Sequence, residues 1–214
     1  MAPLPDVPEA ARRDLEHLAA RDPDLARIEV VAGPLPWRRR APGFAGLLQA
    51  IVGQQISAQA AAAIWRRLCA GGGPPDPAAL LALADEELRI CGLSRPKIAH
   101  ARALAAAFAA GSLSEPGLRR MPDAEAVAAI SAVRGLGVWS AEIYLLFALE
   151  RPDVFPAGDL ALAAAVTALK GLPARPTPAA LRQLAEPWRP WRALAARLLW
   201  HYWRHHTGRP TMDD

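Results

Sequence analysis

The chain has 214 residues, enough for one substantial domain or two small lobes that share a cleft, and a net charge of +4 with a pI near 9.7 favours a polyanionic partner. Its two cysteines supply too few thiolates for an iron–sulfur cluster, and Arg, Gly or Pro interrupts each apolar stretch before it reaches membrane-spanning length. Prolines and acidic residues near the N-terminus break up any apolar run of a secretory signal, so we expect a protein of the bacterial cytoplasm.

The first part of the chain is predicted to be helical with irregular connections. Alanine-rich segments that contain few β-branched residues favour helices over strands. We expect a helix over about residues 8–20, followed by an irregular, basic stretch that includes residues 33–40. The apolar residues of 44–68 follow helical spacing with a break near 53–57, where Ser57 can cap a second helix.

The rest of the chain continues the helical pattern to its end. A loop with Pro116 and Gly117 is expected between two of the helices, and a tight glycine turn between two others. The chain should therefore be an all-helical body of about ten helices. The remaining predicted helices cover residues 77–83, 85–91, 95–110, 123–133, 138–149, 159–170, 177–185 and 190–206.

The glycine turn in residues 130–141 is the most informative motif. Gly135 and Gly137 let the backbone turn sharply, while Leu136 between them can anchor the turn in the core. The amides at the start of the next helix, from Val138, then point outward, where they and the helix dipole can hold a phosphate. Such a grip is independent of base sequence, which suits a protein that scans DNA. An ordinary hairpin of two helices with a glycine-rich turn is the alternative.

Asp159 precedes the next apolar helix. Most aspartates in that position simply cap the helix by accepting backbone N–H bonds. Twenty residues separate Asp159 from Trp139, however, and the intervening helix and loop could bring the carboxylate back to the mouth of the hairpin. A catalytic carboxylate and a helix cap are therefore both consistent with this position.

These motifs, in this order, resemble the helix-hairpin-helix and Gly/Pro-Asp (HhH-GPD) signature of a DNA glycosylase superfamily. The glycine turn is followed by Pro156 and Asp159 in the pattern Pro-x-x-Asp. The chain is most similar to the alkylbase branch, the 3-methyladenine DNA glycosylase II (AlkA) class, over about residues 44–203. Further matching segments are Ile51 to Ser57, Gly92 to Ser94 with Lys97, and Pro187 to Arg192 leading to Trp200.

The resemblance implies an all-α fold of two helical lobes with the active-site cleft between them. The full N-terminal β domain that relatives often carry should be absent. Residues 1–43 would form a helix and connector packed with the C-terminal lobe, and residues 44–150 the central lobe with the hairpin at about 123–149. Residues 151–214 would form the C-terminal lobe with the catalytic aspartate. A monomer is expected.

The resemblance also assigns the chemistry. Asp159 falls on the family's catalytic aspartate, which stabilises the oxocarbenium-like sugar and assists the attack of water. Trp139 stands where bifunctional relatives carry a lysine nucleophile, so no Schiff base can form and a monofunctional enzyme is implied. Trp139 and Trp200 match tryptophans that line the base pocket, where aromatic faces attract a cationic alkylated purine. Core packing is the alternative for Trp200, and Ile143 replaces a pocket tyrosine that relatives often have.

The DNA contacts are carried over in the same way. Gln55, with Gln54 as second candidate, matches the wedge that fills the gap left by a flipped nucleotide, although two such residues could instead cap or bridge helices. Lys97 and Ser94 are candidates for a further DNA contact. The phosphate-binding hairpin comprises Gly135, Leu136, Gly137, Val138, Trp139 and Ser140.

One ion is implied and no other cofactor is expected. The family hairpin holds a monovalent cation, Na⁺ or K⁺, through backbone carbonyls, here those of Ser131, Val133 and Gly135. His201 and His205 have the i, i+4 spacing of a metal pair, but no third ligand accompanies them, so zinc is not predicted.

The implied function is base-excision repair of double-stranded DNA. The enzyme would flip an alkylated purine out of the duplex and hydrolyse its N-glycosidic bond, 3-methyladenine first, with 7-methylguanine and ethenoadenine as further substrates. One alternative is a glycosylase with lyase activity for oxidised or mispaired bases, against which Trp139 argues. The other is a non-catalytic helix-hairpin-helix module that binds DNA, against which Asp159 argues.

Overall fold

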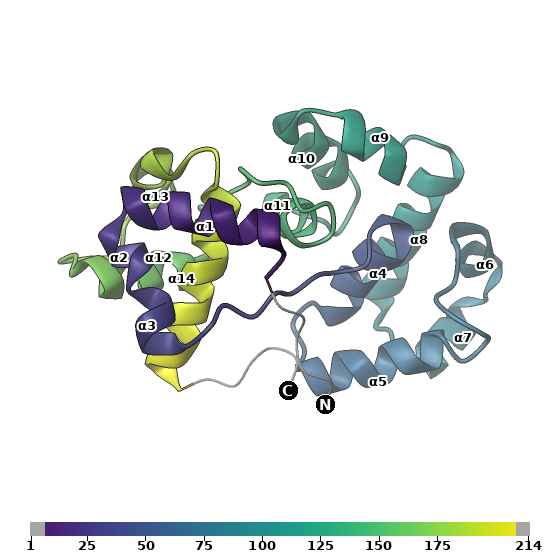
Figure 1. Ribbon diagram of the computed structural model, residues 1–214. Helices are drawn as coiled ribbons and strands as arrows, with labels where there is room; N and C mark the ends of the chain where they lie inside the picture. Colours follow the sequence, from purple (N-terminus) through teal and green to yellow (C-terminus); the bar gives the residue numbers. More distant parts are fainter. Residues whose placement is uncertain (1–6, 209–214) are drawn as a thin grey trace. The chain divides into compact units, whose positions relative to one another are not determined.

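The computed structural model describes residues 7–208, which form fourteen α-helices and one 3₁₀ helix and contain no strand (Figure 1). The all-α prediction is therefore confirmed for this part of the chain. These residues divide into two compact units: unit 1 contains residues 7–39 and 150–208, and unit 2 contains residues 40–149. Across 7–208, no helix combines the length and the apolar character needed to cross a membrane.

Unit 1 is organised around its last helix, α14, which contacts α1, α2, α3 and α12. In Figure 1 the yellow α14 lies beside the purple helices from the start of the chain, so residues far apart in sequence share one core. That core includes Leu18, Ile28 and Leu199, all fully buried. The elements of unit 1 are α1 (Glu9–Arg21), α2 (Pro23–Ala26), α3 (Ile28–Ala32), α12 (Leu160–Lys170), α13 (Pro178–Leu184), η1 (Glu186–Trp188) and α14 (Arg192–Thr207).

A buried arginine connects α14 to the segment that follows α3. The guanidinium of Arg197 donates a hydrogen bond to the carbonyl of Arg38 (2.7 Å) and lies 4.3 Å from the ring centroid of Trp37. Burial lowers the pKa of Arg197 to about 10, so the group remains charged at neutral pH. Its contacts satisfy the charge within the core and hold residues 37–38 against α14.

Unit 2 is organised around the long helix α8, which contacts α4, α6 and α7, while α11 contacts α10 and α4. Leu47, Ile51 and Leu104 are fully buried and belong to its core. The helices of unit 2 are α4 (Gly43–Gly53), α5 (Ala58–Leu68), α6 (Pro77–Ala82), α7 (Asp85–Ile90), α8 (Arg95–Ala109), α9 (Glu115–Arg120), α10 (Asp123–Ser131) and α11 (Val138–Phe147).

Capping side chains determine where several helices begin. The break predicted near 53–57 is present, and the Ser57 hydroxyl accepts the N–H of Ala60 (3.2 Å) at the start of α5. Asp76 caps α6 in the same way by accepting the N–H of Ala79 (2.7 Å). These bonds satisfy N–H groups that the first turn of a helix leaves without an intrahelical partner.

Two sequence predictions were wrong. The segment between the first helix and residue 33 is not irregular, because it forms α2 and α3; Asp22 caps α2 and accepts the N–H of Asp24 (3.0 Å). The loop expected around Pro116 is the short helix α9. The Ser114 hydroxyl accepts the N–H of Gly117 (3.2 Å), and a proline in the first turn is compatible with a helix. Short capped helices therefore raise the number above the ten expected.

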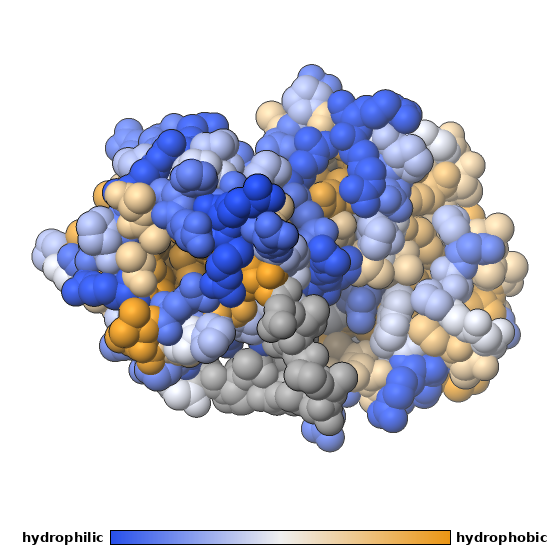
Figure 2. Space-filling model, viewed as in Figure 1, coloured by the Kyte–Doolittle hydropathy of each residue, from blue (hydrophilic) through white to orange (hydrophobic). Residues whose placement is uncertain are grey.

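Hydrophobic side chains reach the surface at a few places. Figure 2 shows hydrophilic residues over much of unit 1, a mixture of hydrophilic and hydrophobic residues over unit 2, and a hydrophobic patch over α3 in unit 1. Val30 and Val31 of that helix are both exposed. Single exposed hydrophobic residues are common on protein surfaces, so this small patch by itself indicates no function.

Candidate functional site

Asp159 caps α12 in unit 1 and receives three hydrogen bonds on one oxygen. Its Oδ1 accepts the N–H groups of Ala161 (2.8 Å) and Leu162 (2.9 Å) and the indole N–H of Trp200 (3.2 Å). The capping role considered from the sequence is therefore present. Three donors on Oδ1 fix the direction of the carboxylate.

Trp200 lies on α14, partly exposed, and its indole is a hydrogen-bond partner of Asp159. The family resemblance implies that this residue lines the base pocket, but it gives no indication of the hydrogen bond to Asp159. The two residues are 41 positions apart, and they meet because α12 packs against α14. No local motif carries that information, so only the tertiary structure reveals the pair.

The predicted glycine turn joins α10 and α11 in unit 2. Gly135 has φ +92°, in the region that favours glycine, and a Cβ atom there would lie 2.2 Å from the imidazole ring of His100. Leu136 is buried and anchors the turn, as the sequence indicated. Glycine is therefore required at position 135 by the backbone conformation and by the packing of α8.

The first turn of α11 faces outward. The N–H of Ala141 bonds to the carbonyl of Gly137 (3.0 Å), so the amides of residues 138–140 precede the first intrahelical bond. Val138 and Trp139 are 54% and 48% exposed. This end of α11 offers the N–H groups and positive dipole end that bind anions, beside an exposed indole.

The two candidate wedge residues differ in their contacts. Gln54 follows the end of α4, and its Nε2 donates a hydrogen bond to the carbonyl of Gly135 (2.8 Å), so it bridges two elements as the sequence alternative proposed. Gln55 is exposed and has φ +58°, a conformation that residues other than glycine rarely adopt. Gln55 is thus the candidate whose side chain faces solvent.

Lys97 has a structural contact that sequence reasoning missed. Its Nζ donates to the carbonyl of Val52 (2.6 Å) near the end of α4, and burial lowers its pKa. Ser94, the residue before α8, is exposed and makes no side-chain capping bond. The contact of these two residues with DNA stays a prediction.

Ile143 lies on α11 one helical turn beyond Trp139 and is only 5% exposed. Its side chain therefore belongs to the buried side of the helix, and its place in a base pocket stays a prediction.

His201, one of the two histidines with the spacing of a metal pair, has its Nε2 2.9 Å from the carbonyl oxygen of Gly33, and burial lowers its pKa. Within residues 7–208 no group of three metal-ligating side chains forms a metal site.

Exposed hydrophobic side chains flank the predicted site residues in each unit. Ile56 follows Gln55, Val138 and Trp139 begin α11, and Leu160, 75% exposed, follows Asp159. Half of the large hydrophobic residues exposed in the described part of the chain occupy these positions. Val138 and Trp139 are neighbours, whereas Ile56 and Leu160 are single exposed residues of a kind that is common on protein surfaces.

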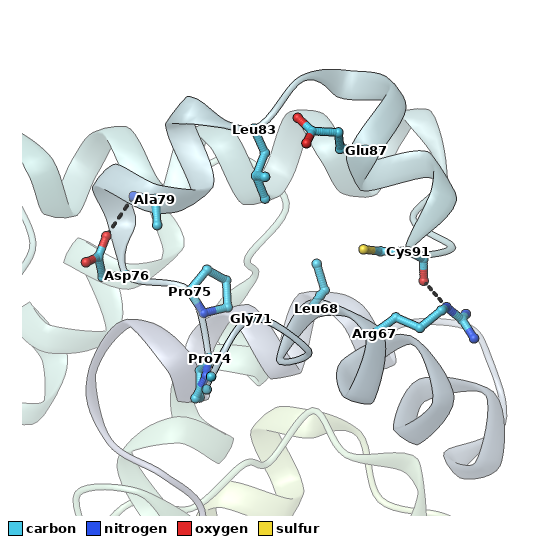
Figure 3. Close-up of a pocket in the computed structure, with 12 residues that line it drawn as sticks. Arg67, Leu68, Gly71, Pro74, Pro75, Asp76, Ala79, Leu83, Glu87 and Cys91 are labelled. Carbon is cyan, nitrogen blue, oxygen red and sulfur yellow. Dashed lines mark hydrogen bonds between the residues drawn. The ribbon is translucent and has the colours of Figure 1, made fainter.

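A pocket of about 490 Å³ lies elsewhere in unit 2, between α5 and the pair α6 and α7 (Figure 3). Its polar groups have structural partners: Arg67 Nε donates to the carbonyl of Cys91 (2.8 Å), and Asp76 caps α6. The Cys91 thiol extends toward its interior (Figure 3). The pocket contains none of the residues that the sequence singled out.

Comparison with known proteins identifies the family. Residues 48–190 match the profile of the HhH-GPD superfamily base excision DNA repair proteins. DNA-3-methyladenine glycosylase 1 of Schizosaccharomyces pombe is 29% identical over 86% of this chain and 84% of its own. A Bacillus halodurans structure titled DNA-3-methyladenine glycosidase has a TM-score of 0.82 at 28% identity, covering 91% of each chain. The S. pombe Mag1 structure with abasic DNA has a TM-score of 0.77 at 28% identity, covering 90% of this chain and 95% of that one. The chain therefore belongs to the HhH-GPD superfamily of base excision DNA repair proteins.

Proposed function

We propose that this protein is a monofunctional DNA glycosylase that removes alkylated purines, 3-methyladenine first, from double-stranded DNA. The observation that carries the proposal is the Asp159 carboxylate, held on one oxygen by two backbone amides and the Trp200 indole. The names of the similar proteins from S. pombe and B. halodurans support 3-methyladenine as the substrate. The similarity to these proteins covers most of this chain and most of theirs, so we propose the complete glycosylase reaction for this chain.

In the proposed reaction the bond between C1′ and the purine nitrogen breaks, and its electron pair leaves with the base. The sugar then carries oxocarbenium-like positive charge, which the Asp159 carboxylate stabilises by charge without forming a bond. Water attacks C1′ and its proton passes to the solvent, so that an abasic site remains. A purine alkylated at N3 or N7 carries a positive charge that makes it a good leaving group, so for these bases little acid catalysis is needed from the protein.

Trp139 supports two features of the proposal. An indole has no amine with which to form a Schiff base, so the DNA strand should remain intact after base release. The exposed face of the same indole attracts a cationic base more strongly than a neutral one. We propose 7-methylguanine and ethenoadenine as further substrates.

The hairpin would bind DNA through backbone groups. The N–H groups at the start of α11 would hold a phosphate, and the carbonyls of Ser131, Val133 and Gly135 would hold a monovalent cation beside it. The carbonyl oxygen of Val133 accepts a hydrogen bond from the N–H of Leu136, and that of Gly135 accepts one from Gln54 Nε2. A carbonyl oxygen has a second lone pair that can bind an ion. These two oxygens would therefore still be able to accept an ion.

The test is release of free base from methylated duplex DNA, identified by mass, with strand cleavage followed before and after alkali. Asp159→Asn keeps a capping oxygen but removes the charge, so base release should fall at least about a hundredfold while DNA binding persists. Asp76→Asn makes the same change in the cap of α6 and should leave activity unchanged.

The outcomes separate the three functions under consideration. Release of 3-methyladenine by the wild type, with breaks only after alkali, supports the proposal. Strand breaks without alkali would instead favour a glycosylase with lyase activity. DNA binding without release of any modified base would favour a non-catalytic module.

A further inference from the structure

The side chain of Gln54 connects two DNA-binding candidates of unit 2. Gln54 lies between the end of α4 and Gln55, and its Nε2 donates to the carbonyl of Gly135 in the hairpin turn at 2.8 Å. The bond is partly buried and joins residues 81 positions apart. The segment that carries the candidate wedge and the turn that carries the phosphate-binding amides are therefore joined by one amide.

Helix α8 holds both partners of this bond in place. Lys97 donates to the carbonyl of Val52 at 2.6 Å, two residues before Gln54. One turn further along α8, the ring of His100 packs so closely on Gly135 that a Cβ atom there would be only 2.2 Å from it. The distance between the end of α4 and the glycine turn is thus constrained by α8 as well as by Gln54.

The backbone conformation of Gln55 indicates that the contacts around it hold this segment in place. Its φ of +58° costs free energy for a residue with a side chain, and such conformations persist where neighbouring contacts impose them. Gln54 on its N-terminal side is fixed to the hairpin, and Ser57 on its C-terminal side caps α5. The exposed side chain of Gln55 is therefore presented from a short segment held at both ends.

We propose that Gln54 is a positioning residue for base flipping, which sets the Gln55 wedge at a fixed distance from the phosphate held by the hairpin. A wedge must enter the base stack beside the nucleotide that is flipped, so its position relative to the gripped phosphates matters. This inference rests on the proposed function for the role of Gln55. It adds that the two DNA contacts act as one unit because the Gln54 amide links them.

The test is a double-mutant cycle on base flipping, read from the fluorescence of 2-aminopurine placed beside an abasic-site analogue in duplex DNA. Gln54→Met keeps the length of the side chain and removes its N–H donors. Gln54→Met and Gln55→Ala should each lower the flipping equilibrium about three- to tenfold, and the double variant should be no worse than Gln55→Ala alone. Coupled effects of this kind indicate that Gln54 acts through Gln55.

Gln49→Met is the matched control, because Gln49 is exposed on α4 and the substitution is the same. It should leave flipping unchanged. The thermal midpoint of every variant is measured, and Gln54→Glu, which also removes the donors, replaces Gln54→Met if the latter does not fold.

Independent, multiplicative effects of the two substitutions would overturn the proposal, as would wild-type fluorescence in Gln54→Met. This readout needs no bond cleavage. Failure of the proposed function, seen as a wild type that releases no methylated base, is therefore distinguishable from failure of the Gln54 proposal.

Discussion

At the scale of single residues, Asp159 has the capping role that the sequence offered as one alternative, and the catalytic role is the one we propose. The same oxygen that caps α12 also accepts the indole N–H of Trp200, so a helix terminus and an aromatic side chain orient one carboxylate. The cap could be predicted from the sequence because it depends on neighbouring residues. The indole bond could not, because it depends on how α14 crosses α12.

Trp200→Phe keeps an aromatic ring and removes the N–H donor. Hydrogen bonds to charged groups are stronger than neutral ones, so the rate of base excision should fall about tenfold or more, while affinity for abasic duplex DNA changes little. Single-turnover excision and DNA binding measure the two quantities. Trp203→Phe on the same helix should leave both unchanged. Equal losses in the two tryptophan variants would contradict a role for the Trp200 N–H.

At the scale of elements, helices were predictable where local signals define them, as at Ser57 and across the glycine turn. Helices α2 and α9 were not predicted, because Pro23 and Pro116 resemble loop residues unless their place in a first turn is recognised. The contact of Gln54 with the hairpin depends on tertiary packing and has no sequence signal. The sequence thus predicts the local helices better than the tertiary contacts that hold the site residues in place.

The glycine turn offers a comparison of two glycines that only Leu136 separates. Gly135→Ala combines a positive φ with a clash against His100 and should lower the free energy of unfolding by about 2–4 kcal/mol. Gly137→Ala is the control, since its φ is −106° and no atom lies within 4 Å of its added Cβ. Denaturant unfolding measures both. Similar losses in the two variants would show that the packing on His100 is unimportant.

The contact of α14 with Gly33 predicts a pH dependence of stability. Burial lowers the pKa of His201 below its ordinary 6.5, so the unfolded chain binds a proton more readily than the folded one. The free energy of unfolding should therefore fall as the pH drops below about 6.5. His201→Gln should flatten this part of the profile, whereas His205→Gln, at an exposed position, should not. An unchanged slope in His201→Gln would contradict the assignment.

At the scale of the whole molecule, charge indicates how DNA is held. The net charge is only +4, and several arginines are paired with carboxylates, among them Arg12 with Glu29 and Arg192 with Asp153. Fewer positive side chains are therefore available for phosphates than the count of basic residues suggests. Backbone amides of the hairpin would supply a grip that needs no side-chain charge.

The small number of positive side chains available for phosphates predicts that DNA binding depends only modestly on salt concentration. The logarithm of the association constant against the logarithm of KCl concentration should have a slope of about −3 to −5, corresponding to a few neutralised phosphates. Equilibrium titrations of fluorescent duplex at several salt concentrations measure it. A slope steeper than about −8 would indicate an extensive basic surface and contradict the prediction.

The two stretches of chain that make up unit 1 have a consequence for how the protein is made. On the ribosome, α1, α2 and α3 emerge before unit 2, but their partners α12 and α14 follow only after all of unit 2 has been synthesised. Leu18, Leu25 and Ile28, buried in the finished protein, remain uncovered during that interval. Unit 2 can complete its core first, because its residues are continuous. The nascent chain thus passes through a stage in which unit 2 is folded and the apolar side chains of α1, α2 and α3 are accessible to chaperones that bind apolar segments.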